Sequence, residues 1–143
     1  MAIIPAGPDH VAVLTDLALQ LHGEFRDQLP RFDYWAASES IKASVLQPFS
    51  CIDLECRGAL LLVETPYWFS RDRGLFDLMF YVRPDARGSR LAVEMLDYGK
   101  RAADAHGLQL RIGTSLGDPE KRDRFFARHG FGRAGGSYVW GRP

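Results

Sequence analysis

The feature that most constrains the fold is an apolar stretch that passes through a short loop into the longest helical pattern of the chain. Residues Leu75–Val82 are dense in aromatic and aliphatic side chains, as expected for a central strand covered on both faces. Residues Ser89–His106 repeat apolar side chains every three or four positions and stop at Gly107, which is typical of a long amphipathic helix with a glycine cap. A buried strand that leads so directly into a long helix predicts a fold of the α/β (α+β) class.

The other elements follow from the apolar periodicity and from the turn residues between the periodic segments. We expect further strands at Ala2–Pro5, Ser50–Cys56, Ala59–Phe69, Leu108–Thr114 and about Arg133–Trp140, and further helices at Val11–Gly23, Asp33–Gln47 and Asp118–Gly130. Gly23 is the expected stop of the first helix, and Arg57-Gly58 is the expected turn of a hairpin. The three consecutive strands between Ser50 and Val82 should therefore be antiparallel.

Length and composition fit one domain that spans residues 1–143. A chain of 143 residues with 46% hydrophobic and 25% charged residues can bury a core without disulfides or metals. The longest apolar runs, such as Ala59–Val63, are far shorter than the roughly 20 residues of a membrane span, and no signal-peptide pattern is present. Cys51 and Cys56 should lie on opposite faces of a strand, which argues against pairing. We expect a cytoplasmic protein that does not contact membranes.

Charge is balanced over the whole chain but divided along it. Residues 1–82 hold six Lys and Arg against eleven Asp and Glu, whereas residues 83–143 hold twelve against seven. Overall neutrality argues against a nucleic-acid partner, because such binding neutralises many phosphates on one face. A basic half could hold a small polyanion, and uneven scattering of surface charge is an equally good interpretation.

The loop before the long helix carries residues suited to binding phosphate. The first amides of a helix lack internal partners and lie at the positive end of its dipole. Gly88 and Ser89 are small enough for a ligand to approach the backbone, and Arg87 and Arg90 can add charge-assisted hydrogen bonds. Such a turn can also serve packing alone.

Two segments together resemble a known family. They read FYVRPDARGSRLAVEMLDYGKRAADAHG and, farther on, RFFARHGF. They resemble the GCN5-related N-acetyltransferases, whose signature is a V-x-P turn followed by Q/R-x-x-G-x-G/A at the start of a long helix. Val82-Arg83-Pro84 matches the turn, Arg87 and Ala92 match the first and last signature positions, and Arg90 stands where the family usually has glycine. This form is similar to that of a bacterial and phage-associated branch.

The resemblance implies a fold and a cofactor site. The fold is a mixed, mostly antiparallel sheet of about six or seven strands with helices on both faces, splayed between the fourth and fifth strands. Acetyl-CoA would place its pantetheine arm in that gap and its pyrophosphate on the loop. The residues implied to bind it are Phe80, Tyr81, Val82, Arg87, Gly88, Ser89, Arg90, Leu91, Ala92 and Phe126.

Transfer to an amine also needs a base and, in many enzymes, an acid for the departing thiolate. Asp77 and Glu64 are the carboxylates that could act as the base, and each could instead be a solvated residue or an ion-pair partner, which such carboxylates more often are. The family often uses a tyrosine as the acid at the position that Phe126 holds here. Tyr138 or Tyr81 could replace it, or the thiolate could leave with the help of water.

An acceptor pocket is expected from the loop Glu24–Phe32, the start of the second helix and the end of the hairpin. Glu24, Tyr34, Tyr67 and Trp68 would give it aromatic walls and an acidic rim suited to a primary amine. The same aromatic residues could instead be packing or a homodimer contact. No pair of His or Cys has convincing metal-ligand spacing, so we expect no metal.

The resulting hypothesis is an acetyl-CoA-dependent N-acetyltransferase that acts on a primary amine, in a small molecule or an exposed amino group, by direct transfer in a ternary complex. The alternative is a CoA-binding or protein-interaction module that keeps the fold without turnover. Phe126 and Arg90 motivate this alternative, because both depart from the family pattern.

Overall fold

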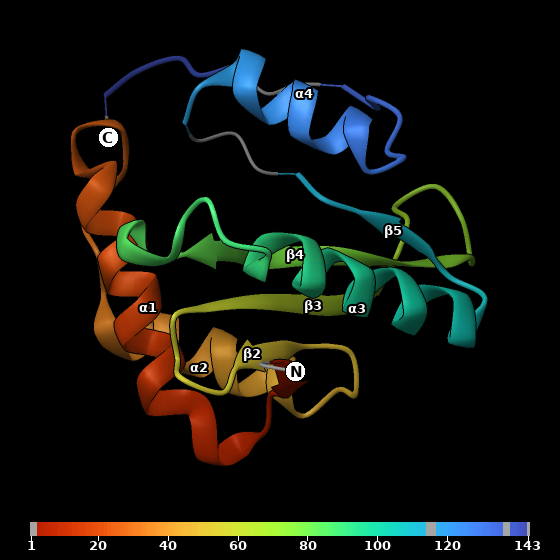
Figure 1. Ribbon diagram of the computed structural model, residues 1–143, viewed down its shortest axis with the longest axis horizontal. Helices are drawn as coiled ribbons and strands as arrows, with labels where there is room; N and C mark the ends of the chain where they lie inside the picture. Colours follow the sequence, from red (N-terminus) through yellow and green to blue (C-terminus); the bar gives the residue numbers. More distant parts are fainter. Residues whose placement is uncertain (1–2, 114–116, 136–137, 143) are drawn as a thin grey trace.

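Five strands form one sheet in the computed structural model, which describes residues 3–113, 117–135 and 138–142 (Figure 1). The strands are β1 (Ile3–Pro5), β2 (Cys51–Asp53), β3 (Gly58–Pro66), β4 (Arg73–Val82) and β5 (Gln109–Arg111). Their order in the sheet is their order in the chain, with β4 and β5 parallel and every other neighbouring pair antiparallel. The expected mixed, mostly antiparallel sheet is confirmed.

Helices cover both faces of this sheet (Figure 1). The α-helices are α1 (Val11–Glu24), α2 (Tyr34–Val45), α3 (Leu91–His106) and α4 (Pro119–Arg128), and the 3-10 turns are η1 (Pro8–His10), η2 (Arg26–Gln28) and η3 (Pro84–Ala86). Alternate residues of β3 enter two cores: Leu60 and Leu62 pack toward α3, and Leu61 packs toward α1 and α2. All three side chains are fully buried. This two-sided burial explains why the apolar run of β3 is continuous rather than alternating. No helix in the described ranges combines the length and apolarity needed to cross a membrane.

Capping residues fix the helix boundaries that the sequence indicates. The Asp33 carboxylate accepts a hydrogen bond from the Ala36 amide at 3.0 Å at the start of α2. The Asp118 carboxylate does the same for Glu120 at 3.0 Å at the start of α4. Gly107 ends α3 in the left-handed conformation, with φ of 63°. These three predicted boundaries are confirmed.

Several expected boundaries differ from the structure, among them the end of β3 at Pro66 rather than Phe69, and two of the differences have a clear local cause. Helix α1 continues through Gly23 and ends at Glu24, because Gly23 does not adopt the left-handed conformation that a glycine stop requires. Strand β2 ends at Asp53 rather than at Cys56, because Asp53 closes the following turn and Cys56 sits in that turn with φ of 59°. The two cysteines are unpaired, as expected.

The expected strand at about Arg133–Trp140 is also absent at its described residues, 133–135 and 138–140. This short stretch contains two glycines, Gly135 and Gly136, and Gly132 directly precedes it; glycine weakens a strand because it has no side chain to pack. Tyr138 and Trp140 are fully exposed and therefore contribute no burial to hold a strand in place. The described part of the sheet thus has five strands rather than six or seven.

The turn after β2 depends on a buried carboxylate. Asp53 is fully buried and accepts from the Arg57 Nε at 2.7 Å, the Arg57 Nη2 at 3.1 Å and the Arg57 amide at 3.1 Å. Burial alone would raise the pKa of Asp53, but the hydrogen bonds and charge of Arg57 outweigh it and hold the pKa below its ordinary value. The Arg57 carbonyl in turn accepts from the Arg83 amide at 2.7 Å, so this turn supports the loop that follows β4.

We expect the substitution Asp53→Asn to lower the free energy of unfolding by about 1–3 kcal/mol at pH 7, because it weakens charge-assisted hydrogen bonds at a buried site. A lowered carboxyl pKa stabilises the fold above the unfolded pKa, and this stabilisation is lost as the pH falls through the folded pKa. The difference between Asp53→Asn and the native chain should therefore shrink in acid. Urea unfolding at pH 7 and near pH 3 measures both effects. The control is Glu55→Gln in the same turn, whose exposed carboxylate lies 3.5 Å from Arg57 and should cost little.

Candidate functional site

The pairing between β4 and β5 is short. It joins Gly74 to Gln109, Leu75 to Leu110 and Phe76 to Arg111. Among the described residues, no strand pairs with β4 beyond Phe76 on this edge, although β4 continues to Val82. Over the last six residues of β4, one edge of the strand therefore has no neighbouring strand in the described sheet. The main-chain amides and carbonyls on that edge need other hydrogen-bond partners.

Asp77 stands where this pairing ends. Its Oδ1 accepts a hydrogen bond from the Gly113 amide at 2.6 Å, so the carboxylate links β4 to the chain just after β5. Burial raises the pKa of Asp77 above its ordinary value, and the hydrogen bond from Gly113 opposes this rise in part. A partly buried carboxylate with a raised pKa is better suited to take up a proton near neutral pH than an ordinary one.

A β-bulge directly follows Asp77. In the register of β3 and β4, Leu62 lies opposite Asp77 and Leu61 lies opposite Met79, so Leu78 is the extra residue. The bulge resets which side chains face each side of the sheet. After it, Phe80 packs with the α3 core, whereas Met79 and Tyr81 pack with the core of α1 and α2. Bulges of this kind redirect side chains near functional sites.

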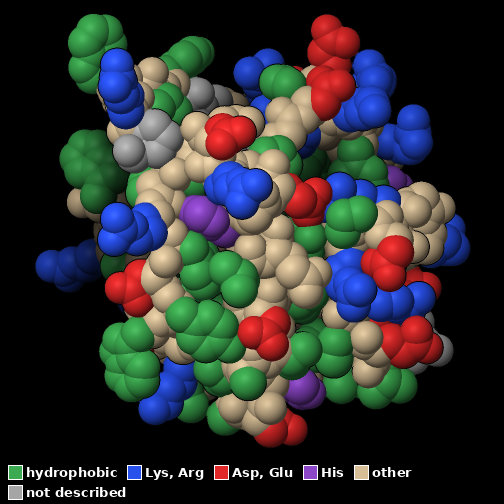
Figure 2. Space-filling model, turned by 90° about the vertical axis from the view of Figure 1, so that its left-hand side faces the viewer, with side chains coloured by type: hydrophobic (Ala, Val, Ile, Leu, Met, Phe, Trp, Pro, Cys, Tyr) green, Lys and Arg blue, Asp and Glu red, His purple; other side chains and the backbone are tan. Residues whose placement is uncertain are grey.

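A cavity of about 290 Å³ lies beside the last residues of β4. Its walls come from α1, β4, the loop to α3, α3 and α4, through Leu21, Phe25, Phe80, Tyr81, Val82, Arg87, Ala92 and Phe125. The volume is at the lower end of small-molecule pockets, and most of the walls are apolar. Figure 2 looks onto the end of the molecule where β4 ends and shows basic, acidic and hydrophobic side chains side by side there, rather than a face of one charge.

The loop from β4 to α3 closes one end of this cavity. Gly88 has φ of 85°, which other residues rarely adopt, and a Cβ there would meet no protein atom within 4 Å. The Ser89 hydroxyl donates to the Ala86 carbonyl at 2.6 Å and accepts from the Leu91 amide at 3.3 Å. In the described ranges, no side chain caps the next amides of α3, and Arg90 makes no side-chain cap. The loop is thus open to an anion at the positive end of the helix.

Glu24, Tyr81 and Arg87 meet at the rim of the cavity. The Arg87 Nη2 lies 2.8 Å from Oε1 and 2.9 Å from Oε2 of Glu24, and the Tyr81 hydroxyl donates to Oε2 at 2.5 Å. The Arg87 Nε also donates to the Val82 carbonyl at 3.0 Å. Burial, followed by the hydrogen bond to Glu24, raises the pKa of Tyr81 to about 12. At neutral pH this phenol stays protonated and keeps its bond to the carboxylate.

Phe126 packs in a cluster of aromatic rings. Its ring centroid lies 6.1 Å from that of Phe80 and 5.4 Å from that of Phe131. Its neighbour Phe125, rather than Phe126, lines the cavity. The position therefore anchors α4 against β4 and offers no proton donor.

The four residues expected to bind the acceptor do not lie together. Glu24 is at the rim of the cavity, and Tyr34 donates to Asp16 at 2.9 Å between α1 and α2. Tyr67 and Trp68 lie at the β3–β4 hairpin, where Trp68 is 95% exposed. Tyr138, a candidate acid, is exposed in a segment without secondary structure.

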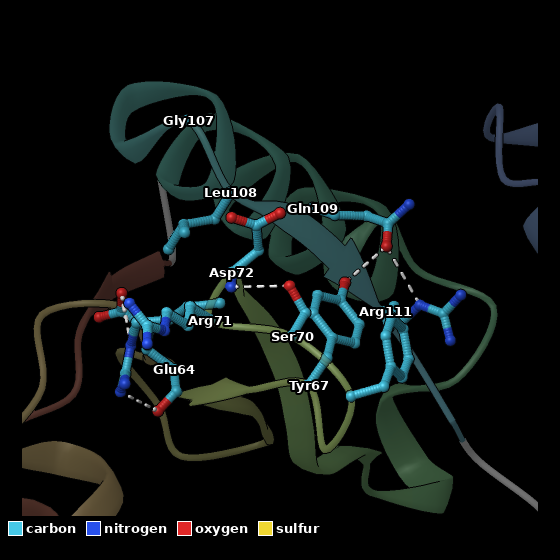
Figure 3. Close-up of a pocket in the computed structure, with 11 residues that line it drawn as sticks. Glu64, Tyr67, Ser70, Arg71, Asp72, Gly107, Leu108, Gln109 and Arg111 are labelled. Atoms are coloured by element: carbon cyan, nitrogen blue, oxygen red, sulfur yellow. Dashed lines mark hydrogen bonds and ion pairs between the residues drawn. The ribbon is translucent and has the colours of Figure 1, made fainter.

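The hairpin residues Glu64 and Tyr67 line a second, larger cavity of about 750 Å³ at the opposite end of β4 (Figure 3). Glu64 pairs with the Arg73 Nε at 3.3 Å, and the Tyr67 hydroxyl donates to Gln109 at 2.6 Å. Glu64 lies opposite Leu75, six residues before Tyr81 on β4. At about 3.3 Å per residue, this separates Glu64 from Tyr81 by roughly 20 Å along the strand.

Sequence reasoning missed the contribution of α1 to the cavity. Leu21 and Phe25 line it, and they continue the spacing of three and four residues that starts at Leu14 and Leu17. That spacing could have extended the apolar face of α1 to Phe25. The bulge at Leu78 and the Gly113 amide on Asp77 have no signal in the sequence. Across the residues that the structure describes, no three His, Cys, Asp or Glu side chains form a group that could hold a metal ion.

The fold is similar to those of several solved proteins, acetyltransferases among them. An integron cassette protein from the mobile metagenome of Cole Harbour salt marsh matches with a TM-score of 0.74 and 23% identity, over 99% of this chain and 90% of that chain. Aminoglycoside 6'-N-acetyltransferase AAC(6')-Ig from Acinetobacter haemolyticus matches with 0.71 and 13%, over 100% and 99%. AAC(6')-Iy, solved with the bisubstrate analogue CoA-S-monomethyl-acetylneamine, matches with 0.71 and 14%, over 99% and 97%.

No protein-family model matches this sequence, and no curated protein matches it. The structural matches confirm the expected resemblance to GCN5-related N-acetyltransferases at the level of the fold.

The resemblance predicts CoA binding at this loop, and on that prediction we expect Gly88→Val to weaken the binding about tenfold or more. The branched side chain strains the positive-φ backbone and blocks the approach of a ligand to the loop. The matched control is Gly107→Val, because Gly107 also has positive φ and open space around its Cα but lies at the far end of α3. Both variants should lose similar stability in thermal unfolding, and only Gly88→Val should change the Kd in isothermal titration calorimetry. Equal affinity in the two variants would remove this loop from the binding site.

Proposed function

We propose that this protein is an acetyl-CoA-dependent N-acetyltransferase that transfers an acetyl group to a primary amine directly, within a ternary complex. The observation that carries the proposal is the edge of β4 beyond Phe76, where no strand among the described residues pairs and which leads from Asp77 along the cavity to the open N-terminus of α3. The likeness to the fold of AAC(6')-Iy, which was solved with a CoA bisubstrate analogue, supports it.

In this proposal the sheet is splayed between β4 and β5, and the pantetheine arm lies along β4. Its amides pair with main-chain groups of this edge near Phe80, Tyr81 and Val82, much as a neighbouring strand would. The apolar side chains of Leu21, Phe25 and Phe125 in the cavity wall contact the carbon atoms of the arm.

The pyrophosphate meets the backbone from Arg87 to Ala92, where Gly88 leaves room and the helix dipole favours negative charge. Arg90 is exposed at the N-cap of α3 and can add its guanidinium to a phosphate. The arginine at the usual glycine position thereby contributes charge where it does not obstruct the cavity wall.

Asp77 is the proposed base. The acceptor amine arrives as an ammonium ion, and Asp77 takes one of its protons, directly or through water. The nitrogen lone pair then forms a bond to the thioester carbonyl carbon, the C–S bond breaks, and CoA leaves as a thiolate. A second proton leaves the nitrogen and can protonate the thiolate through water. Glu64 lies opposite Leu75, two residues before Asp77 on β4, and its carboxylate is already paired with the Arg73 guanidinium, so Asp77 is the better candidate.

Neither candidate tyrosine is well suited to donate the proton to the thiolate. The pKa of Tyr81 is raised to about 12, so proton transfer from this phenol to an ordinary thiolate is uphill. Tyr138 lies exposed in the C-terminal segment. We propose that the thiolate leaves with the help of water.

Phe126 favours one alternative, a CoA-binding module without turnover, because its ring is held in an aromatic cluster and has no proton to give. General acid help contributes about 10²–10⁴-fold, whereas positioning of the reactants can contribute more, so loss of the acid leaves the enzyme hypothesis intact.

Calorimetry with CoA and a thiol-release assay with a panel of primary amines separate these possibilities. We expect CoA to bind with a Kd below 1 mM and at least one amine to give steady, acetyl-CoA-dependent release of thiol. Binding without release from any amine would favour the module. Absence of binding would reject both.

We further expect Asp77→Asn to lower kcat by about 10²-fold while leaving the Kd for CoA unchanged, because it removes the base and keeps an acceptor for the Gly113 amide. Stability should not fall. A raised carboxyl pKa means that ionisation opposes folding, so the contribution of Asp77 is most favourable below its unfolded pKa and declines as the pH rises through the folded pKa. The neutral asparagine avoids this penalty at pH 7.

Steady-state kinetics and thermal unfolding measure the two effects of Asp77→Asn. The control is Asp104→Asn, which removes an exposed carboxylate from α3. Unchanged kcat in Asp77→Asn would exclude Asp77 as the base, and a marked loss of stability would assign it a structural role instead.

A further inference from the structure

We infer that Glu24 is an exchangeable counter-ion for Arg87, which a phosphate group of the bound nucleotide displaces, and that Glu24 thereby sets the affinity of the site for phosphate-bearing ligands. The inference rests on the proposed function, because it assigns the nucleotide to the cavity beside β4. It makes Glu24 a positioning residue rather than the acceptor-binding residue that the sequence suggests.

Glu24 contacts residues that are far from it in the sequence. Glu24 is the last residue of α1, whereas Arg87 belongs to the loop before α3. Both carboxylate oxygens lie within 2.9 Å of the Arg87 Nη2, and one of them also accepts from Tyr81. Arg87 is thereby held over the rim of the cavity, with its Nε on the Val82 carbonyl.

The Glu24 carboxylate binds the Arg87 guanidinium where a phosphate group of a ligand in the cavity could bind it instead. It accepts charge-assisted hydrogen bonds from a guanidinium, as a phosphate does, and it lies at the rim of the cavity that leads to the open amides of α3. The diphosphate of CoA carries two negative charges, against one on a carboxylate, and its oxygens can accept bonds from Arg87 and from the α3 amides together. A bound nucleotide can therefore compete for Arg87.

The ion pair is also poorly placed to be permanent. Glu24 lies at the C-terminal end of α1, where the helix dipole disfavours negative charge. The side chains of Arg87 and Glu24 are 48% and 27% exposed, so water weakens their attraction. After exchange, Glu24 keeps the hydrogen bond from Tyr81, so the carboxylate is not left without a partner.

The substitution Glu24→Gln tests this exchange, because glutamine keeps an oxygen for Tyr81 and removes the negative charge that competes for Arg87. Calorimetry with CoA and with pantetheine, which lacks the phosphates, gives the readout. We expect Glu24→Gln to bind CoA about two- to fivefold more tightly and pantetheine with unchanged affinity, in line with the modest strength of a half-exposed ion pair.

Two further variants separate exchange from a general effect of charge. In the Arg87→Gln background, Glu24→Gln should change the Kd for CoA by less than about 1.5-fold, because the counter-ion has lost its partner. Glu120→Gln removes the same charge from a surface ion pair with Arg124 on α4 and should leave the Kd for CoA unchanged. Thermal unfolding verifies that each variant is folded.

The outcomes are distinct. Unchanged or weaker CoA binding by Glu24→Gln, equal tightening for pantetheine, or full tightening in the Arg87→Gln background would overturn the exchange and leave the proposed function standing. Absence of CoA binding to the native chain would overturn both.

Discussion

The early end of the pairing between β4 and β5 is the constraint on which the candidate site depends. Main-chain amides and carbonyls need hydrogen-bond partners, and three paired residues at the start of β4 leave its second half without a strand on that side in the described sheet. The other features of the site are arranged around this edge. Asp77 marks where pairing stops, the bulge at Leu78 sets which side chains face α1 and which face α3, and the strand ends at the loop that opens α3. A ligand with amides along its length and phosphate at its end matches this order of features.

Folding brings together the two halves of the chain that differ in charge. The acidic half supplies Glu24 at the end of α1, and the basic half supplies Arg87 in the loop before α3. At this end of the molecule, basic, acidic and hydrophobic side chains lie side by side rather than forming a face of one charge (Figure 2). At the rim of the cavity, the cation Arg87 is paired with the carboxylate of Glu24. Such a pair can be neutral when the cavity is empty and still recognise an anion, provided that the carboxylate can be exchanged.

Continuous motifs were predicted well, and features that depend on tertiary contacts were not. Caps such as Asp33 and Asp118 act within a few residues, so the sequence marks the starts of their helices. The end of α1 was missed because a glycine ends a helix only where it adopts the left-handed conformation. Gly23 does not adopt it, and the sequence alone does not show this. The sequence placed Glu24, Tyr34, Tyr67 and Trp68 around one pocket by proximity to predicted loops. In the fold, the antiparallel register sends the hairpin to one end of β4 and α1 to the other. The identity of a partner across the sheet is set by register, which local patterns do not encode.

Phe126, which stands where the family often has a tyrosine, affects only the departure of the thiolate, which is the less demanding step of the proposed reaction. An alkyl thiol such as that of cysteine has a pKa of about 8.5, so its thiolate is a stable leaving group near neutral pH and does not require a strong acid. The acceptor is different, because an alkyl ammonium ion such as that of lysine has a pKa of about 10.4 and cannot attack until it loses a proton. A site of this kind can therefore dispense with its acid more readily than with its base. The partly buried Asp77, at the point where β4 and β5 cease to pair, fits a site that needs a base more than an acid. Phe126 instead packs α4 against β4 through its contact with Phe80.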